Sequence, residues 1–343
     1  MTAAIDHKPT VGQTDAKPVL DVDSMSVEIR TISGTVRAVN EVSFQASRGE
    51  TLALLGESGC GKSMTATALV GLLEPVAEVV SGSAALGGVD LFSVGRAKRR
   101  EMAGTELAIV FQDALTALNP LYTVGTQLAE PFRIHHNLSA KQAKRKAIDL
   151  MTRVGIPQPE SRLNSYPHQF SGGMRQRLLI AMAVALNPSV LIADEPTTAL
   201  DVTVQAQILD LLRTLQARTG MAVIFVTHDL GVVADLCSRV LVMYAGQVVE
   251  EATVEELFAR PRHPYTEGLL AAIPQAGTSG ERLASIPGVV PSAVAMPTGC
   301  RFHPRCPYAV PECETVPVEL TTVSDGHRAR CIRVDELALE GAQ

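Results

Sequence analysis

Short runs of apolar residues recur along the chain, each bounded by polar residues or glycine. Such runs are typical of strands that are buried on both faces of a parallel sheet. Between them lie stretches with the periodicity of helices that bury one face. Strands alternating with helices predict an α/β fold with a mostly parallel sheet. The predicted strands are residues 51–55, 190–193, 221–226 and 239–244, and the predicted helices are residues 62–73, 138–154 and 204–217.

The helix predicted over residues 138–154 carries clear end signals. Ser139 has the side chain of an N-cap, and Gln142 follows three residues later, which is a capping-box pattern. Gly155 is a typical stop. Its apolar residues recur at helical spacing, so the basic residues of 141–146 fall on the opposite, solvated face.

The pattern divides the chain into three parts. Residues 1–18 are polar and predict a disordered tail. Residues 19–260 form the α/β core, in which strand signals vanish between about 115 and 188 and predict an inserted helical subdomain. From 261 to 343 the composition shifts towards Pro, Gly and Cys, which predicts a small, loop-rich C-terminal module.

Composition excludes several classes of function. The 343 residues are 46% hydrophobic and 19% charged, which excludes bulk disorder. The formal net charge of −6 and an aromatic content of 4% argue against nucleic acid as a partner. The longest apolar run, Leu178 to Leu186, is far shorter than the roughly 18 residues that span a bilayer. We therefore expect a soluble chain without a membrane span.

A phosphate-binding motif follows the first predicted buried strand and begins a helix. The segment from Gly56 to Ser63 reads GESGCGKS and satisfies G-x-x-x-x-G-K-[ST]. Glycines let backbone N–H groups surround phosphate oxygens, and the helix N-terminus adds a favourable dipole. Lys62 is expected to reach the β- and γ-phosphates, and the Ser63 hydroxyl to bind Mg²⁺. The candidate residues are Gly56, Glu57, Ser58, Gly59, Cys60, Gly61, Lys62, Ser63 and Met64.

Two adjacent carboxylates end the strand predicted over residues 190–193. Asp194 is placed to complete the shell of the magnesium ion. Glu195 is the candidate general base that activates water for attack on the γ-phosphate.

Four further segments follow one another in the order found in the ATP-binding cassette (ABC) family. Gln112 lies in Val-Phe-Gln-Asp, Ser171 begins Ser-Gly-Gly-Met, Asp201 ends Ala-Leu-Asp, and His228 lies in Val-Thr-His-Asp. With the two phosphate-site segments, the chain resembles this family over residues 56–229. The resemblance implies a P-loop NTPase (RecA-like) fold with an inserted helical subdomain, and ATP with Mg²⁺ as ligands.

The resemblance also implies roles for these residues. Gln112 would join Ser63 and Asp194 at the magnesium ion and link the site to a transmembrane partner. His228 would orient the γ-phosphate and the attacking water. In this family a signature segment and a D-loop act on ATP that is bound to a second cassette, so a second ATPase subunit is expected. The corresponding residues are Ser171, Gly172, Gly173 and Met174 of the signature segment and Asp201 of the D-loop.

The C-terminal segments 262–266 (RHPYT) and 299–309 (GCRFHPRCPYA) are similar to the extension of dipeptide and oligopeptide importer ATPases. The similarity implies a subunit that energises peptide import from the cytoplasmic side of the membrane, as a peripheral protein. Its partners would be two permease subunits and an external binding protein. Import of nickel or another small solute is the alternative, and a non-transport ABC ATPase of DNA repair or translation is less favoured.

Four cysteines gather in this C-terminal part: Cys300, Cys306, Cys313 and Cys331. Zinc sites usually show tighter pairs of ligands, about 2–4 residues apart, so the spacing does not favour zinc. Four thiolates suffice to ligate a [4Fe–4S] cluster, and the family resemblance points the same way. Four free thiols are the alternative.

One feature departs from the family pattern. Its members commonly stack adenine on an aromatic residue upstream of the P-loop, but the only aromatic residue before Gly56 is Phe44, in a predicted core strand. Either aliphatic groups between about Ile29 and Val39 contact the base, or the partner subunit does.

Overall fold

The larger of two sheets forms the centre of the molecule. The computed structural model describes residues 17–113, 117–198, 200–273 and 285–342. The strand order of this sheet is β11-β12-β10-β9-β3-β8-β7-β6, and the five strands from β9 to β6 run parallel to one another. The parallel strands are β3 (Thr51–Leu55), β6 (Leu107–Val110), β7 (Val190–Asp194), β8 (Ala222–Thr227) and β9 (Arg239–Tyr244).

All four strands predicted from apolar runs are therefore present and adjacent. Their side chains are almost entirely buried, because helices cover both faces of the sheet. Three of these helices are α1 (Lys62–Val70), α8 (Val202–Thr219) and α9 (Leu230–Leu236).

The three predicted helices all differ at their ends from the sequence expectation, and the one predicted over residues 138–154 is observed as Ala140–Arg153. Helix α1 ends at Val70 rather than at residue 73, because Gly71 adopts a left-handed conformation (φ 75°) and caps it. Helix α8 begins at Val202, earlier than the predicted residue 204, because the side chain of Asp201 is its N-cap.

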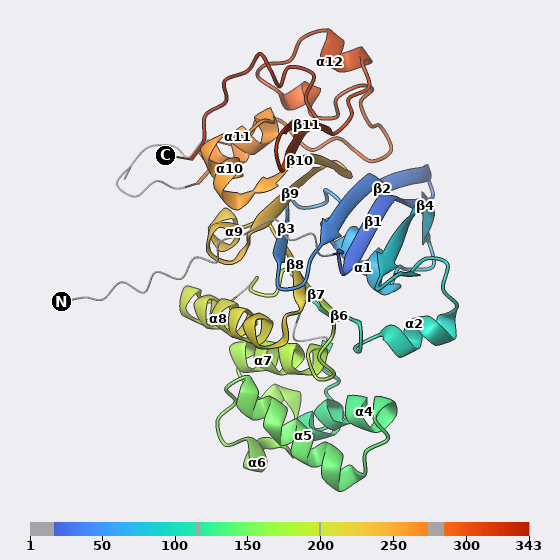
Figure 1. Ribbon diagram of the computed structural model, residues 1–343, viewed down its shortest axis with the longest axis vertical. Coiled ribbons are helices and arrows are strands. Elements are labelled where there is room, and N and C mark those ends of the chain that lie inside the picture. The colour runs from blue at the N-terminus through green and yellow to red at the C-terminus, as the bar shows by residue number, and fades with distance from the viewer. Residues whose placement is uncertain (1–16, 114–116, 199, 274–284, 343) are drawn as a thin grey trace, which may run out of the picture.

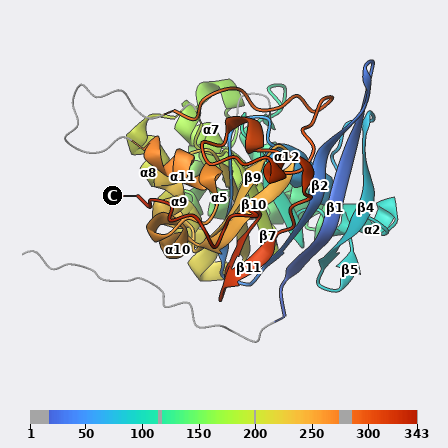
Figure 2. The ribbon, with the colours of Figure 1, turned by 90° about the horizontal axis from the view of Figure 1, so that it is seen from above.

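The second sheet is antiparallel, in the order β2-β1-β4-β5, and lies beside α1. Figures 1 and 2 show this sheet and α2 on one flank of the molecule and helices α8 to α10 on the other. Its elements are β1 (Leu20–Thr31), β2 (Gly34–Ala46), β4 (Ala77–Leu86) and β5 (Val89–Asp90), followed by α2 (Arg96–Met102).

Between β6 and β7 the chain is helical, and its described residues contain no strand. These helices form the end of the molecule opposite the C-terminal region (Figure 1). The predicted capping box is confirmed, since Ser139 and Gln142 bond reciprocally at the start of α5. The elements are α4 (Val124–His135), α5 (Ala140–Arg153), α6 (Pro159–Arg162), η1 (Pro167–Gln169) and α7 (Gly172–Ala183).

The C-terminal region is loop-rich and continues the core sheet. Strand β12 pairs antiparallel with β10, and β11 pairs with β12. Phe302 packs against Tyr244 of β9 and against Tyr265, with ring centroids 5.1 and 5.4 Å apart. Strand β10 (Gln247–Thr253) and α10 (Val254–Ala259) precede this region, whose elements are α11 (Pro264–Ala271), η2 (His303–Arg305), α12 (Glu312–Thr315), β11 (Thr321–Ser324) and β12 (His327–Ala329).

Two expectations concern the chain ends and the membrane. The predicted disordered tail falls, for residues 1–16, outside the described part of the chain. Among the described helices, none combines the length and the apolar character needed to cross a membrane.

Candidate active site

The P-loop connects β3 to the first turn of α1, where backbone approaches backbone closely. A Cβ atom at Gly61 would lie 2.8 Å from the carbonyl oxygen of Ala38, and one at Gly56 would collide with the Met243 carbonyl. Gly61 also has φ 105°, which only glycine adopts without strain. Glycine at both positions is therefore a steric requirement of this loop.

Lys62 and the loop form a compact polar group. Lys62 Nζ donates to the carbonyl oxygens of Gly56 (2.8 Å) and Glu57 (3.1 Å), and its side chain is buried. Loop residues and the first residues of α1, Lys62 among them, line one cavity. A glycine-rich loop followed by a helix N-terminus is an arrangement that binds phosphate.

Asp194 ends β7 beside the start of α1. Ser63 Oγ donates to Asp194 Oδ1 at 3.1 Å, which unites two residues that are 131 positions apart in the chain. Burial, and then the charge of Glu195, raise the pKa of Asp194, while the hydrogen bond from Ser63 opposes the rise. A hydroxyl and a carboxylate side by side are the oxygen donors that Mg²⁺ prefers, so these residues fit the ion.

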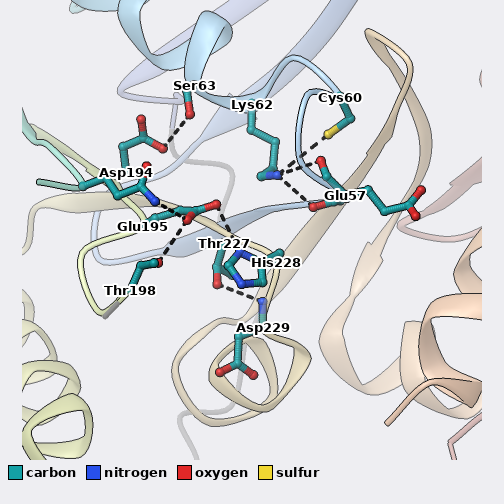
Figure 3. A network of polar contacts seen from close by, with 12 residues as sticks. Glu57, Cys60, Lys62, Ser63, Asp194, Glu195, Thr198, Thr227, His228 and Asp229 are labelled. Atoms are coloured by element: carbon teal, nitrogen blue, oxygen red, sulfur yellow. Dashed lines mark hydrogen bonds and ion pairs between the residues drawn. The ribbon is translucent and has the colours of Figure 1, made fainter. Parts of the chain in front are cut away.

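The carboxylate of Glu195 is the centre of a polar network (Figure 3). Its Oε2 accepts hydrogen bonds from Gln112 Nε2 (2.9 Å) and Thr198 Oγ1 (3.0 Å), and its Oε1 lies 3.1 Å from His228 Nδ1. The backbone of Glu195 has φ 44°, a strained conformation for a residue with a side chain. The predicted residues Gln112, Glu195 and His228 are therefore together, and the network also includes Thr198, which the sequence did not indicate as a site residue.

The signature segment lies elsewhere. Ser171 is the N-cap of α7 and accepts a hydrogen bond from the backbone N–H of Met174 at 3.4 Å. A Cβ atom at Gly173 would lie 2.6 Å from Val204 of α8, so this glycine allows α7 and α8 to pack closely. Residues 171–174 do not line the cavity that the described P-loop residues line.

Asp201, the predicted D-loop aspartate, lies at the start of α8 and is its N-cap. Asp201 Oδ1 accepts from the N–H of Val204 at 2.9 Å, so its side chain is engaged in capping within this chain. Ala199 of the same segment lies outside the described residues.

A cavity of about 420 Å³ adjoins the P-loop. Ser58, Gly59, Gly61, Lys62, Ser63 and Met64 line it, together with Gln112 and Glu195. Cys60 does not line this cavity; its thiol is buried beneath the loop, and burial raises its pKa.

Side chains of the C-terminal region form hydrogen bonds with the P-loop, a contact that the sequence did not indicate. Arg305 donates from both terminal nitrogens to the carboxylate of Glu57, at 2.7 and 3.1 Å, across 248 residues. The backbone N–H of Glu57 donates to the Tyr265 hydroxyl at 2.9 Å. Arg305 and Tyr265 lie within the segments that resemble importer extensions, but no local pattern says what they contact.

The four C-terminal cysteines lie around one small pocket: Cys300, Cys306, Cys313 and Cys331. Burial raises the pKa of Cys306 and of Cys331 to about 11, and neighbouring thiols act in the same direction. Within the described part of the chain, no three His, Cys, Asp or Glu side chains are grouped so that they could hold a metal ion. The structure thus brings the predicted cysteines together without supporting the predicted [4Fe–4S] cluster.

Known proteins match both parts of the chain. Residues 39–198 match the family described as ABC transporter, and residues 249–313 match the C-terminal region of oligopeptide/dipeptide transporters. The dipeptide transport ATP-binding protein DppD of Escherichia coli (strain K12) is 47% identical over 313 residues, which cover 91% of this chain and 96% of that protein.

Solved structures show the same fold. The dimeric ABC transporter cassette MJ0796 is 25% identical with a TM-score of 0.62, over 68% of this chain and 98% of that one. Its post-hydrolysis state, bound to ADP and Pi, gives the same TM-score and coverage at 24% identity.

Fold, site and similarity define a P-loop ATPase of α/β architecture. The chain belongs to the ABC transporter family, in the branch with the oligopeptide/dipeptide transporter C-terminal region. The family resemblance, the fold class and the ATPase activity expected from the sequence are confirmed.

Proposed function

We propose that this chain hydrolyses ATP to energise the import of dipeptides or oligopeptides through a membrane assembly. The supporting observation is the Glu195 carboxylate, which Gln112, Thr198 and His228 hold at the edge of the P-loop cavity. The solute is inferred from the name of the Escherichia coli relative and from the matching C-terminal region.

The residues divide the work of hydrolysis. Lys62 and the loop N–H groups bind the β- and γ-phosphates, and Ser63, Asp194 and Gln112 are the residues that would hold Mg²⁺. That ion neutralises phosphate charge when bound. Glu195 accepts a proton from water as the water oxygen bonds to the γ-phosphorus and the bond to the bridging oxygen breaks. ADP and phosphate are the products.

The signature segment supports a dimer. Ser171 and the first N–H groups of α7 form a helix N-terminus that does not face this chain's own P-loop cavity. We infer that they contact the γ-phosphate of ATP bound to a second cassette, and that Asp201 lies at the same interface.

The test is Glu195→Gln, which keeps the size of the side chain but removes the base. Hydrolysis should fall by about 10²–10⁴-fold while ATP binding persists and an ATP-dependent dimer accumulates in gel filtration. Asp210→Asn, which changes an exposed carboxylate of α8, is the control and should hydrolyse ATP normally. Undiminished hydrolysis by Glu195→Gln would overturn the assignment.

An apolar cavity of about 340 Å³ next to Gln112 supports a permease partner. Leu72, Met102, Phe111 and Met182 are among its lining residues, and Leu72 and Phe111 are exposed large apolar side chains. We propose that one of two permease subunits inserts here, which places the chain peripherally on the cytoplasmic face of the membrane, with an external binding protein on the other side.

Membrane recovery tests this docking. Leu72→Asp should reduce the fraction of the chain that co-sediments with membranes containing the permease. Ile32→Asp is the control, because Ile32 is fully exposed on the β1–β2 turn, away from this cavity. Equal recovery of both variants would contradict permease docking at this cavity.

We also propose that the four C-terminal cysteines ligate a [4Fe–4S] cluster. The proposal rests on the four cysteines that line one small pocket, because four thiolates are a ligand set for such a cluster; as they stand, the described side chains form no group that could hold a metal ion. The test is anaerobic purification with iron, sulfide and zinc analysis. Cys306→Ser should lose iron and sulfide and Cys237→Ser should retain them; a wild-type chain without iron would refute the cluster.

A further inference from the structure

The C-terminal region forms one wall of the nucleotide cavity. Besides the P-loop, Gln112 and Glu195, the cavity is lined by Val290, Pro291, Ala293 and Met296. This segment follows the P-loop by more than two hundred residues and belongs to none of the ABC motifs. On the remaining side the cavity is lined by Ile29, Val36, Arg37 and Ala38 of β1 and β2, and by Ala245 and Gly246.

The chemistry of the cavity changes along its length. The phosphate-binding groups are at the P-loop, where Lys62 and the glycines lie. The remaining lining is mainly aliphatic, so it suits the uncharged base rather than the triphosphate. Ile29 and Val36 are register partners in the paired strands β1 and β2, and together they supply one apolar surface.

The upstream aromatic residue that could have stacked on a base is not available. Phe44 is 3% exposed and packs in the core beneath the antiparallel sheet. The flat faces available to a base are therefore aliphatic. A methionine thioether is polarizable and contacts aromatic rings favourably, and the proline ring is rigid.

We propose that Val290, Pro291 and Met296 form the adenine-binding wall of this ATPase, opposite Ile29 and Val36. This inference rests on ATP being the nucleotide that the chain binds. It assigns the C-terminal region a direct part in nucleotide affinity, in addition to any part in partner or metal binding.

Arg305 positions this wall. Its guanidinium donates to the carbonyl oxygens of Pro287 (2.9 Å) and Ile286 (3.3 Å), which precede the wall in the chain. The same guanidinium donates to the carboxylate of Glu57 in the P-loop. The side chain is 4% exposed, so water does not compete for these bonds. One planar group thus fixes the distance between the phosphate end and the wall.

The affinities of the full-length chain for two ligands distinguish the contribution of the wall from that of the phosphate site. Mg·ATP carries a base, whereas magnesium tripolyphosphate has only the phosphate chain. The double variant Val290→Ala/Met296→Ala should weaken Mg·ATP about tenfold by calorimetry, from the lost apolar contacts. Its affinity for tripolyphosphate should stay within about twofold.

A matched control exists in the same segment. Val289 and Val294 are 84% and 57% exposed and do not line the cavity, so Val289→Ala/Val294→Ala should bind both ligands like the wild type. Unchanged Mg·ATP affinity in the wall variant, or an equal loss for both ligands, would overturn the proposal. A wild-type chain that binds neither ligand would instead refute the ATPase assignment.

Arg305→Lys tests the positioning role. Lysine keeps the positive charge beside Glu57 but lacks the planar fork that also reaches Pro287 and Ile286. We expect weaker Mg·ATP binding with unchanged tripolyphosphate binding. Equal losses for both ligands would show that Arg305 acts on the P-loop alone.

Discussion

A fully buried carboxylate, that of Glu250 in β10, bonds the C-terminal region to the core sheet. Glu250 Oε1 accepts from the backbone N–H of Arg262 at 2.6 Å and lies 2.7 Å from His327 Nε2, and its Oε2 accepts from the N–H of His263 at 3.0 Å. Because His327 begins β12, this group joins the last strands of the chain to the ATPase core.

Glu250→Gln should destabilise the protein strongly. The amide has one acceptor oxygen in place of two, so at least one buried donor loses its partner, which costs about 1–3 kcal/mol. The bonds that remain lose the assistance of the negative charge. We therefore expect a loss of about 1–3 kcal/mol, the cost of leaving a buried donor without its acceptor.

Urea unfolding, followed by circular dichroism, measures this loss. Glu256→Gln is the matched control, because the ion pair of Glu256 with Arg260 is exposed on both sides and should contribute little to stability. The Glu250 variant should unfold at a clearly lower urea concentration than the control. Equal midpoints would show that Glu250 does not hold the C-terminal region to the core.

Three further predictions concern single residues. Burial raises the pKa of Asp194 in the folded state, so the ionised carboxylate lowers the stability of the fold at pH values above the unfolded pKa. Asp194→Asn should therefore raise the melting temperature at pH 7 and abolish Mg²⁺-dependent hydrolysis. A lowered melting temperature would contradict this. Burial lowers the pKa of His263 to about 3, so at low pH the unfolded chain binds a proton that the folded chain does not. The free energy of unfolding should therefore fall as the pH drops below about 6.5, by at most about 1.4 kcal/mol per pH unit for one proton. This pH dependence should be weaker in His263→Gln. Gly173→Ala would force apart α7 and Val204, so hydrolysis should fall while ATP binding by the isolated chain persists, and normal hydrolysis would show that the close packing is dispensable.

Local sequence patterns predict most of the core. The apolar run of residues 51–55 and the segment from Gly56 to Ser63 specify strand, loop and helix from neighbouring residues alone, and they lie where the pattern indicates. The helix ends were less predictable because they depend on single backbone conformations, such as that of Gly71.

Contacts across long separations could not be predicted. The pair of Arg305 with Glu57 spans 248 residues, and an arginine in a loop has no local pattern that names its partner. Thr198 reaches Glu195 because of the tight turn after β7, a geometry that its residue type alone does not specify. The wall at Val290 and Met296 likewise depends on how the C-terminal region folds back over β2 and the P-loop.

Uptake of labelled dipeptide by cells that lack this chain tests the central claim most directly. The account predicts that cells without the chain take up little dipeptide, that the wild-type chain restores uptake, and that Glu195→Gln does not, although it reaches the same cellular level. Restoration of uptake by Glu195→Gln, or full uptake without the chain, would contradict the claim that ATP hydrolysis at this site energises peptide import.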